Sequence, residues 1–361
     1  RRQRQMCIRD SIIMNKIYSF YAICAVAMMA SCSSDGENAF NKQDNNHVAF
    51  GTYVDMPSRA LDKSYFSTGD EICINAFQNS TTTVEHEFTN NFMNNETLSK
   101  TTAGWTYVNS KFWPMNSNDR VSFVAAFPNI NPTIAAGICT FPFSVNANAA
   151  LQQDFMWSTI TDAHRNDRNG THQNGVLENP NTTPLDNVVL HFRHALSRIV
   201  FNAKTATYYS GATITITDIV VNNLYGKGSY SLTADLGKGN WTTTGNQDCT
   251  YTPLSGGTTN VINTSNRTFG TSLLMIPQVL NTTVGKESTV TIKYTVNYSN
   301  PSKVVNESRT FNLATAALLN GNTWEQDKVY NYNFNISLDM ITFDAVVDSW
   351  SGSSDSGMTV D

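Results

Sequence analysis

The feature of this chain that most restricts its fold is an alternation of apolar and polar residues. Large apolar side chains occupy every second position from Tyr330 to Met340, with Asn, Ser or Asp between them. Residues 290–298 and 121–127 alternate in the same way. A period of two is typical of a β-strand with one buried face and one solvated face. The pattern therefore predicts antiparallel sheets.

Turn formers and composition support an all-β fold. Charged residues make up 15% of the 361 residues, and Gly226-Lys-Gly228, Gly256-Gly257 and Asn300-Pro301 separate the alternating segments at short intervals. Short strands joined by such turns are typical of antiparallel sandwiches. We expect helix only as brief segments at residues 148–157 and 314–319.

One long polar segment predicts a domain boundary. Residues 162–186 contain almost no apolar side chains and are rich in Asn, Gly and Pro, as expected of a linker or long loop. The prediction is an N-terminal β-sandwich domain at 47–185 and a C-terminal β-sandwich domain at 186–361.

The N-terminal residues have the layout of an export signal. Basic Arg1, Arg2, Arg4 and Lys16 precede an apolar run that ends at Met29-Ala30-Ser31-Cys32. The run is shorter than the roughly 20 residues that a transmembrane helix needs. Its end resembles the lipobox of bacterial lipoproteins, in which the cysteine is acylated and becomes the new N-terminus.

This resemblance predicts a signal peptide with an upstream extension at 1–31 and a lipidated tether at 32–46. Acidic Asp35 and Glu37, just after the cysteine, favour the outer face of an outer membrane. Acyl chains on Cys32 would anchor the protein in outer-membrane lipid. The alternative is an ordinary signal peptide followed by an accidental cysteine.

Charge and cysteine content exclude some classes of protein. The formal net charge is −5, and no basic segment follows the signal, so we expect no nucleic-acid partner. Cys73, Cys139 and Cys249 remain after export, and their odd number and wide spacing favour buried thiols over a disulfide framework. A single disulfide with one thiol left over stays open.

The sequence contains no recognisable catalytic or metal-binding motif. His86-Glu87 lacks the second histidine of a zinc-protease helix, and His191 and His194 are three apart on a predicted strand, where they point to opposite faces. We therefore predict no enzyme, cofactor or metal. Trp105, Tyr107, Trp113 and Trp157 fit either a sugar-stacking platform or a core, and the residues alone do not decide between them.

Several ordered stretches resemble the fimbrillin family (FimA/Mfa-like), the lipoprotein subunits of type V pili. They are KFWP at 111–114, VSFVAAFP at 121–128, VVLHFRHALSRIVF at 188–201, LLMIPQ at 273–278 and WEQDKVYNYNFNISLDMITFDAVVDSW at 324–350. The resemblance implies two tandem β-sandwich domains of Greek-key, transthyretin-like topology.

The resemblance also implies a mode of assembly. Family members are exported as lipidated precursors and cut after an arginine, which removes the first strand and lets another pilin subunit donate a strand in its place. Arg59 and Ala60 match the cut position. Residues 48–55 before it alternate as a strand should. From the residues alone, an exposed loop arginine is the favoured interpretation of Arg59.

These observations predict a cell-surface fimbrial subunit or adhesin. Its expected partners are other pilin subunits, in a homopolymer or heteropolymer, together with a receptor on a host or bacterial surface. Residues 350–361 contain few apolar side chains, so the role as stalk, anchor or tip stays open. The alternative is a non-polymerising surface lipoprotein that binds glycans.

Overall fold

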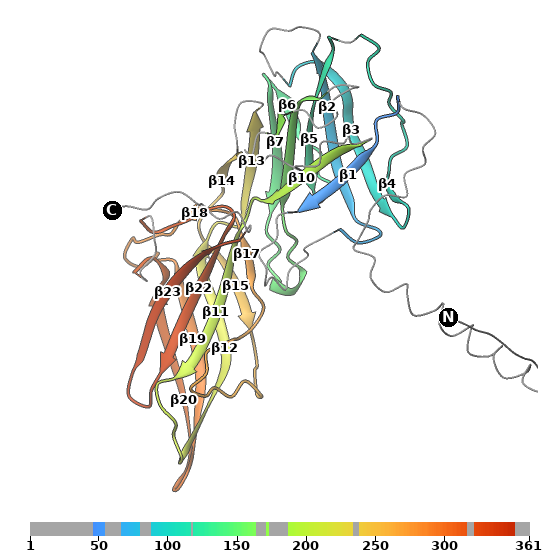
Figure 1. Cartoon of the computed structure of the whole chain (residues 1–361). Helices are drawn as coiled ribbons and strands as arrows, with labels where there is room; N and C mark the ends of the chain where they lie inside the picture. The colour runs from blue at the N-terminus through green and yellow to red at the C-terminus, as the bar shows by residue number, and fades with distance from the viewer. Residues whose placement is uncertain are drawn as a thin grey trace, which may run out of the picture. The chain divides into compact units, whose positions relative to one another are not determined.

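The computed structural model describes residues 46–54, 66–79, 88–116, 118–163, 171–172, 187–233, 238–315 and 321–350. In these ranges the chain is almost entirely β-structure (Figure 1). Helix is limited to two 3-10 turns, η1 at Ala149–Leu151 and η2 at Leu313–Thr315. The expected helix at 148–157 is therefore wrong beyond one turn, because strand β8 begins at Met156. Within the described ranges, no helix is long and apolar enough to span a membrane.

The largest sheet has the strand order β1-β10-β8-β5-β2-β3-β4, with β9 also paired to β8. Its strands are β1 (Phe50–Val54), β2 (Glu71–Asn79), β3 (Asn91–Thr101), β4 (Gly104–Thr106), β5 (Arg120–Phe127), β8 (Met156–Ala163), β9 (Thr171–His172) and β10 (Val188–His194).

A smaller sheet has the order β14-β13-β7-β6. It consists of β6 (Thr133–Ala135), β7 (Ile138–Ser144), β13 (Lys227–Thr233) and β14 (Asn240–Thr244). Its side chains share a core with one face of the large sheet, while the other face of the large sheet holds a separate core. Burial on both faces explains why the central strand β5 is apolar nearly throughout. The solvated face predicted from the alternation at 121–127 is therefore wrong.

Two further sheets share a third core. One has the order β16-β11-β22-β23, with β17 also on β11, and the other has the order β15-β12-β19-β20. The strands are β11 (Ser197–Thr205), β12 (Ala212–Leu224), β15 (Cys249–Leu254), β16 (Arg267–Thr268), β17 (Leu273–Met275), β19 (Thr289–Ser299), β20 (Ser302–Asn312), β22 (Lys328–Ile336) and β23 (Ile341–Ser349). A short pair, β18 (Gln278–Val279) and β21 (Thr323–Trp324), completes the described strands.

The all-β prediction is confirmed, but two strand pairs are not antiparallel. Strand β1 pairs with β10 in parallel, and so does β11 with β22. Parallel neighbours need a long crossover connection, and each of these pairs is joined by a large intervening part of the chain. Alternation within a strand indicates which face is buried and not the direction of the neighbouring strand. The sequence therefore could not predict that these two pairs are parallel.

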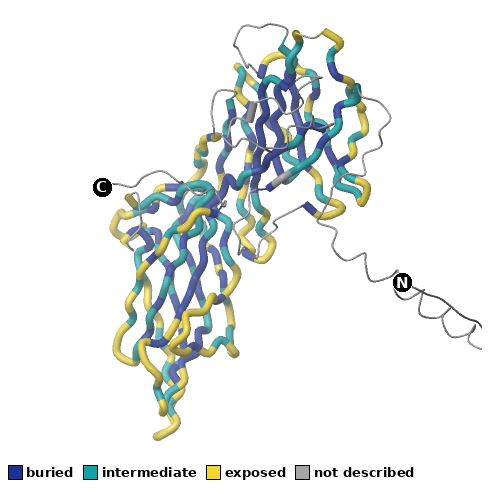
Figure 2. Tube along the Cα trace, in the orientation of Figure 1, coloured by how far each residue is buried: buried dark blue, intermediate teal, exposed yellow. Residues whose placement is uncertain are grey.

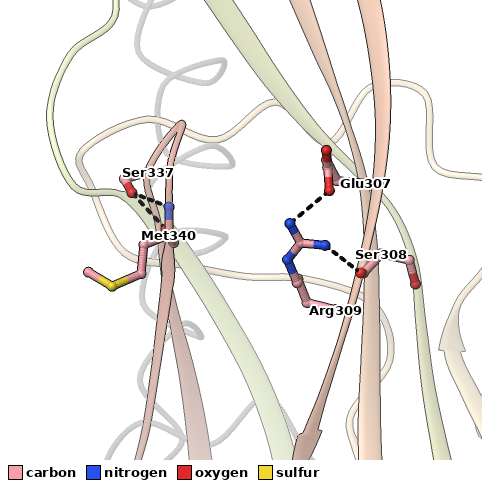
Figure 3. Close-up of polar contacts among 5 residues, drawn as sticks. All are labelled: Glu307, Ser308, Arg309, Ser337 and Met340. Atoms are coloured by element: carbon pink, nitrogen blue, oxygen red, sulfur yellow. Dashed lines mark hydrogen bonds and ion pairs between the residues drawn. The ribbon is translucent and has the colours of Figure 1, made fainter.

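The alternation also gave a wrong prediction at one hairpin. Strand β22 ends at Ile336, and Ser337 begins a turn in which its Oγ accepts a 2.8 Å hydrogen bond from the Met340 amide (Figure 3). Leu338 and Met340, predicted to be buried, are therefore exposed. Figure 2 shows the general pattern, with burial concentrated along the strands and exposure at the hairpin ends.

Figure 3 also shows an ion pair on the edge strand β20. Arg309 Nη2 lies 3.0 Å from Glu307 Oε2, and Arg309 Nη1 donates to the Ser308 carbonyl. Because Arg309 is exposed and Glu307 is only half-buried, the pair contributes about 0–1 kcal/mol. It places charge along the edge of this sheet, which opposes unintended pairing with other strands.

Candidate functional site

Strand β1 is the first element of the large sheet, and it pairs with β10 along one side. The parallel register runs from Phe50 opposite Val188 to Val54 opposite Phe192, and the Val188 amide donates to the Ala49 carbonyl at 2.8 Å. In Figure 1 the two strands lie side by side. The predicted strand at 48–55 is thus confirmed from Phe50 to Val54.

The residues that lead into β1 are hydrogen-bonded on their other side as well. The Val48 amide donates to the Lys111 carbonyl at 2.9 Å, and the Trp113 amide donates to the Asn46 carbonyl at 2.8 Å. His47 and Phe112 form the antiparallel bridge between these bonds. The segment 46–54 therefore joins β10 to the KFWP stretch that follows β4.

Side chains from residues 48–54 fill the core on one face of the large sheet. Val48, Phe50 and Val54 are each at most 5% exposed. The Phe50 ring lies edge-on to Tyr107 and to Phe123, with 5.7 Å between ring centroids in each pair. Burial of a side chain of this size stabilises a fold by about 1.5–3 kcal/mol. We call the space that residues 46–54 occupy, between β10 and residues 111–113, the β1 groove.

Two polar contacts fix β1 against the far end of the sheet. Trp105 Nε1 donates a 3.0 Å hydrogen bond to Thr52 Oγ1, and the Tyr107 hydroxyl donates a 2.7 Å bond to the Val48 carbonyl. Burial raises the pKa of Tyr107, and this effect exceeds the lowering by the hydrogen bond from the Lys111 amide. The hydroxyl therefore keeps its proton and stays a donor.

The next described residue after β1 belongs to the same core. Phe66 is 7% exposed, and its ring lies edge-on to Trp105, Phe127 and Phe192, with centroids 5.1 to 5.4 Å apart. The predicted cut between Arg59 and Ala60 falls between β1 and Phe66. Arg59, Ala60 and the predicted lipidation site Cys32 all lie outside the described residues. A cut at Arg59 would leave residues 46–54 without a covalent link to the core that they complete.

A comparison with protein families supplies the identification. The Fimbrillin-like family profile matches residues 58–350, which includes the described strands after β1. The chain belongs to this fimbrillin-like family. The family consists of structural and adhesive proteins and not of enzymes. The matched range begins beside the predicted cut site and leaves β1 out.

Three solved structures are similar to this fimbrillin-like chain, and the first of them supports its fold. A fimbrial protein from Bacteroides vulgatus is 20% identical, with a TM-score of 0.58 over 84% of this chain and 99% of that one. A protein from Bacteroides uniformis, provisionally described as a cell adhesion protein, is 15% identical, with a TM-score of 0.49 over 84% and 98%. The tip fimbrial protein Mfa3 from Porphyromonas gingivalis is 10% identical, with a TM-score of 0.36 over 83% and 99%. A search of curated proteins gave no match.

The tryptophans considered for a sugar platform belong to the core of the fimbrillin-like fold. Trp105 is 8% exposed, Trp113 1% and Trp157 2%. Tyr107 is half-buried and holds β1. These aromatic side chains therefore stabilise the large sheet and offer no stacking surface to a ligand.

His191 and His194 are both buried. His194 Nδ1 lies 2.5 Å from Asp154 Oδ2, and its ring stacks on Trp350 with centroids 4.0 Å apart. No cluster of three or more His, Cys, Asp or Glu side chains suited to a metal occurs within the described ranges. The contact between His194 and Trp350 joins the end of β10 to the end of β23, and no local sequence signal predicts it.

Cys73, Cys139 and Cys249 are free thiols. Cys73 and Cys139 are buried, as predicted, and Cys249 is half-buried. Burial raises the pKa of both the Cys73 and the Cys139 thiol to about 12. These two thiols therefore stay protonated and unreactive at neutral pH.

Proposed function

We propose that this fimbrillin-like protein is a lipid-anchored fimbrial subunit or adhesin, exported with residues 1–31 as its signal and held in the outer membrane by acylated Cys32. A cut between Arg59 and Ala60 then removes β1, and another pilin subunit donates a strand to the β1 groove. The observation that carries this proposal is that residues 46–54 are hydrogen-bonded on both sides and complete the core.

Loss of residues 46–54 would leave β10 and residues 111–113 without their backbone partners. The Ala49 and Asn46 carbonyls accept hydrogen bonds from Val188 and Trp113, which would lose these partners. The apolar pockets that the side chains of Val48, Phe50 and Val54 now fill would become exposed to solvent. Unpaired edges beside an apolar groove bind an added strand readily, because backbone hydrogen bonds and side-chain pockets are both available.

The two-domain organisation at 47–185 and 186–361 is part of the same proposal. Its support is that the core of the two C-terminal sheets takes all its buried residues from Ile199 onward, apart from Ala149. Strand β10 follows the proposed boundary but pairs with β8 in the large sheet, so it would complete the first domain.

The alternative, a non-polymerising surface lipoprotein that binds glycans, loses the support of Trp105, Trp113 and Trp157, since all three are buried. The β1 groove supports the fimbrial function better. In that function, a receptor on a host or bacterial surface would bind the assembled subunit.

Limited trypsin digestion tests the proposal. The chain carrying Cys32→Ser, to keep it soluble, is digested until mass spectrometry shows a new N-terminus at Ala60, and it is then analysed by size-exclusion chromatography. An Arg59→Ala variant receives the same treatment. We expect oligomers in the cut sample only. A cut chain that stays monomeric and melts at the temperature of the uncut chain would refute the strand-exchange mechanism.

A further inference from the structure

Two adjoining hollows lie beside strand β14, and Lys238 and Gln326 line both of them. Their volumes are about 310 and 350 Å³, at the lower end of the range of small-molecule sites. We call the two hollows together the β14 trough. None of its lining residues belongs to β1, so the trough is a separate feature from the β1 groove.

The first hollow of the trough is basic. Arg193, Lys238 and Lys328 line it together with one acid, Asp327. This local excess of positive charge contrasts with the formal net charge of −5 for the whole chain. The exposed Lys238 precedes β14 and the half-buried Lys328 begins β22, so the fold gathers these cations from distant parts of the chain. Such a hollow favours a negatively charged group.

Two tryptophans, Trp241 and the fully buried Trp324, line the second hollow. Its polar lining is mostly uncharged, with Lys238 and Glu325 as the charged groups. Trp241 is half-buried on β14, and exposed Asn240 lies beside it in the sequence. Thr243 and Thr323 add hydroxyl groups. An indole ring combined with amide and hydroxyl groups suits the apolar face and the hydroxyl groups of a sugar ring.

The walls of the trough are held in place by interactions within the protein. Trp241 Nε1 donates a 2.6 Å hydrogen bond to the Ala195 carbonyl, and its ring lies 5.2 Å from Tyr230. Gln326 Oε1 accepts from the Tyr230 hydroxyl at 3.0 Å, and Gln326 Nε2 donates to the Gly239 carbonyl. A site with fixed walls loses little conformational entropy when a ligand binds.

We propose that the β14 trough binds an acidic carbohydrate, with a sugar carboxylate beside Lys238 and Lys328 and a neighbouring sugar ring against Trp241. The positive charge of the first hollow favours a sugar that carries a carboxylate. The ring and polar groups of the second hollow select a sugar over an acidic peptide. This site does not depend on the cut at Arg59. It differs from the excluded platform because the sugar ring would contact Trp241; of the platform residues, only the buried Trp157 lines the trough.

Isothermal titration calorimetry of the Cys32→Ser chain tests the proposal with cellobiouronic acid and with the neutral disaccharide cellobiose. Two ion pairs of ordinary surface strength give about tenfold tighter binding of the acidic disaccharide. We expect the double variant Lys238→Met with Lys328→Met to bind both disaccharides equally. Lys293→Met removes an exposed lysine on β19 and serves as the matched control, with unchanged affinities.

Further samples separate a sugar site from a general anion site. Asn240→Ala should weaken both disaccharides by the same factor of about threefold, since it removes an uncharged contact. Sodium acetate and a short acidic peptide should bind much more weakly than cellobiouronic acid. The proposal is overturned if cellobiouronic acid gives no binding heat, if the lysine variant keeps the preference for it, or if acetate or the peptide binds as tightly.

Discussion

Replacement of Phe50 by Ala tests how much β1 contributes to the stability of the uncut chain. Phe50 is 1% exposed and lies between the rings of Tyr107 and Phe123. A buried Phe→Ala change costs about 3–5 kcal/mol, and the loss is larger when the cavity cannot collapse. Tyr107 is held by its bond to the Val48 carbonyl, and Phe123 lies within the buried strand β5, so neither ring can move in easily. We therefore expect a loss of about 4–5 kcal/mol.

Urea unfolding of the Cys32→Ser chain, followed by fluorescence and by circular dichroism, measures this loss. Phe112→Ala is the control, because Phe112 lies next to the groove but is 52% exposed. Its loss should be about 1 kcal/mol or less. Equal, small losses for both variants would show that β1 is not an integral part of the core, and the reasoning for the β1 groove would fail.

Three further predictions follow from the same structure and sequence. Thr52→Val should lower the free energy of unfolding in urea by about 1–3 kcal/mol, because it leaves the Trp105 Nε1–H without its acceptor. Thr52→Ser keeps a hydroxyl acceptor and should cost less, and equal losses for the two variants would show that the hydrogen bond is unimportant. Cys73 and Cys139 should resist iodoacetamide in the folded chain while half-buried Cys249 reacts first, and labelling of all three at one rate would contradict this. Because the thiols of Cys73 and Cys139 ionise at lower pH in the unfolded chain, the folded chain should become less stable as the pH rises from about 9 to about 12. Cys32→Ser should abolish acyl labelling and release the protein from membranes, and unchanged membrane retention would refute lipidation there.

Much of the fold could be predicted from local pattern. Strand β19 follows its alternation closely, with Val290, Ile292 and Val296 buried, because side chains on a strand point to alternate faces whatever the neighbouring strand is. The same rule failed at Leu338 and Met340, where Ser337 starts a tight turn inside an unbroken alternation. Period alone does not show where a strand ends.

The sequence could not predict contacts between distant parts of the chain. Strand β1 was predicted as an element, but its parallel pairing with β10 and its bridge to Phe112 depend on the assembled sheet. The β14 trough combines residues of several strands, among them β8, β10, β14, β21 and β22, with their flanking loops, and no local pattern predicts that these strands meet. The burial of Trp105, Trp113 and Trp157 was likewise undecided until packing was known.

Hydrogen exchange at the two edges of the β1 groove tests the central claim most directly. The backbone amides of Val188 and Trp113 donate to Ala49 and Asn46, and the Val145 amide, which donates to Gly226, is the internal control. At dilute concentration, immediately after the cut at Arg59 and removal of the N-terminal fragment, the amides of Val188 and Trp113 should exchange faster while that of Val145 is unchanged. A synthetic peptide of residues 46–55 should restore the slow exchange. Unchanged protection of Val188 and Trp113 after removal of the fragment would contradict the account.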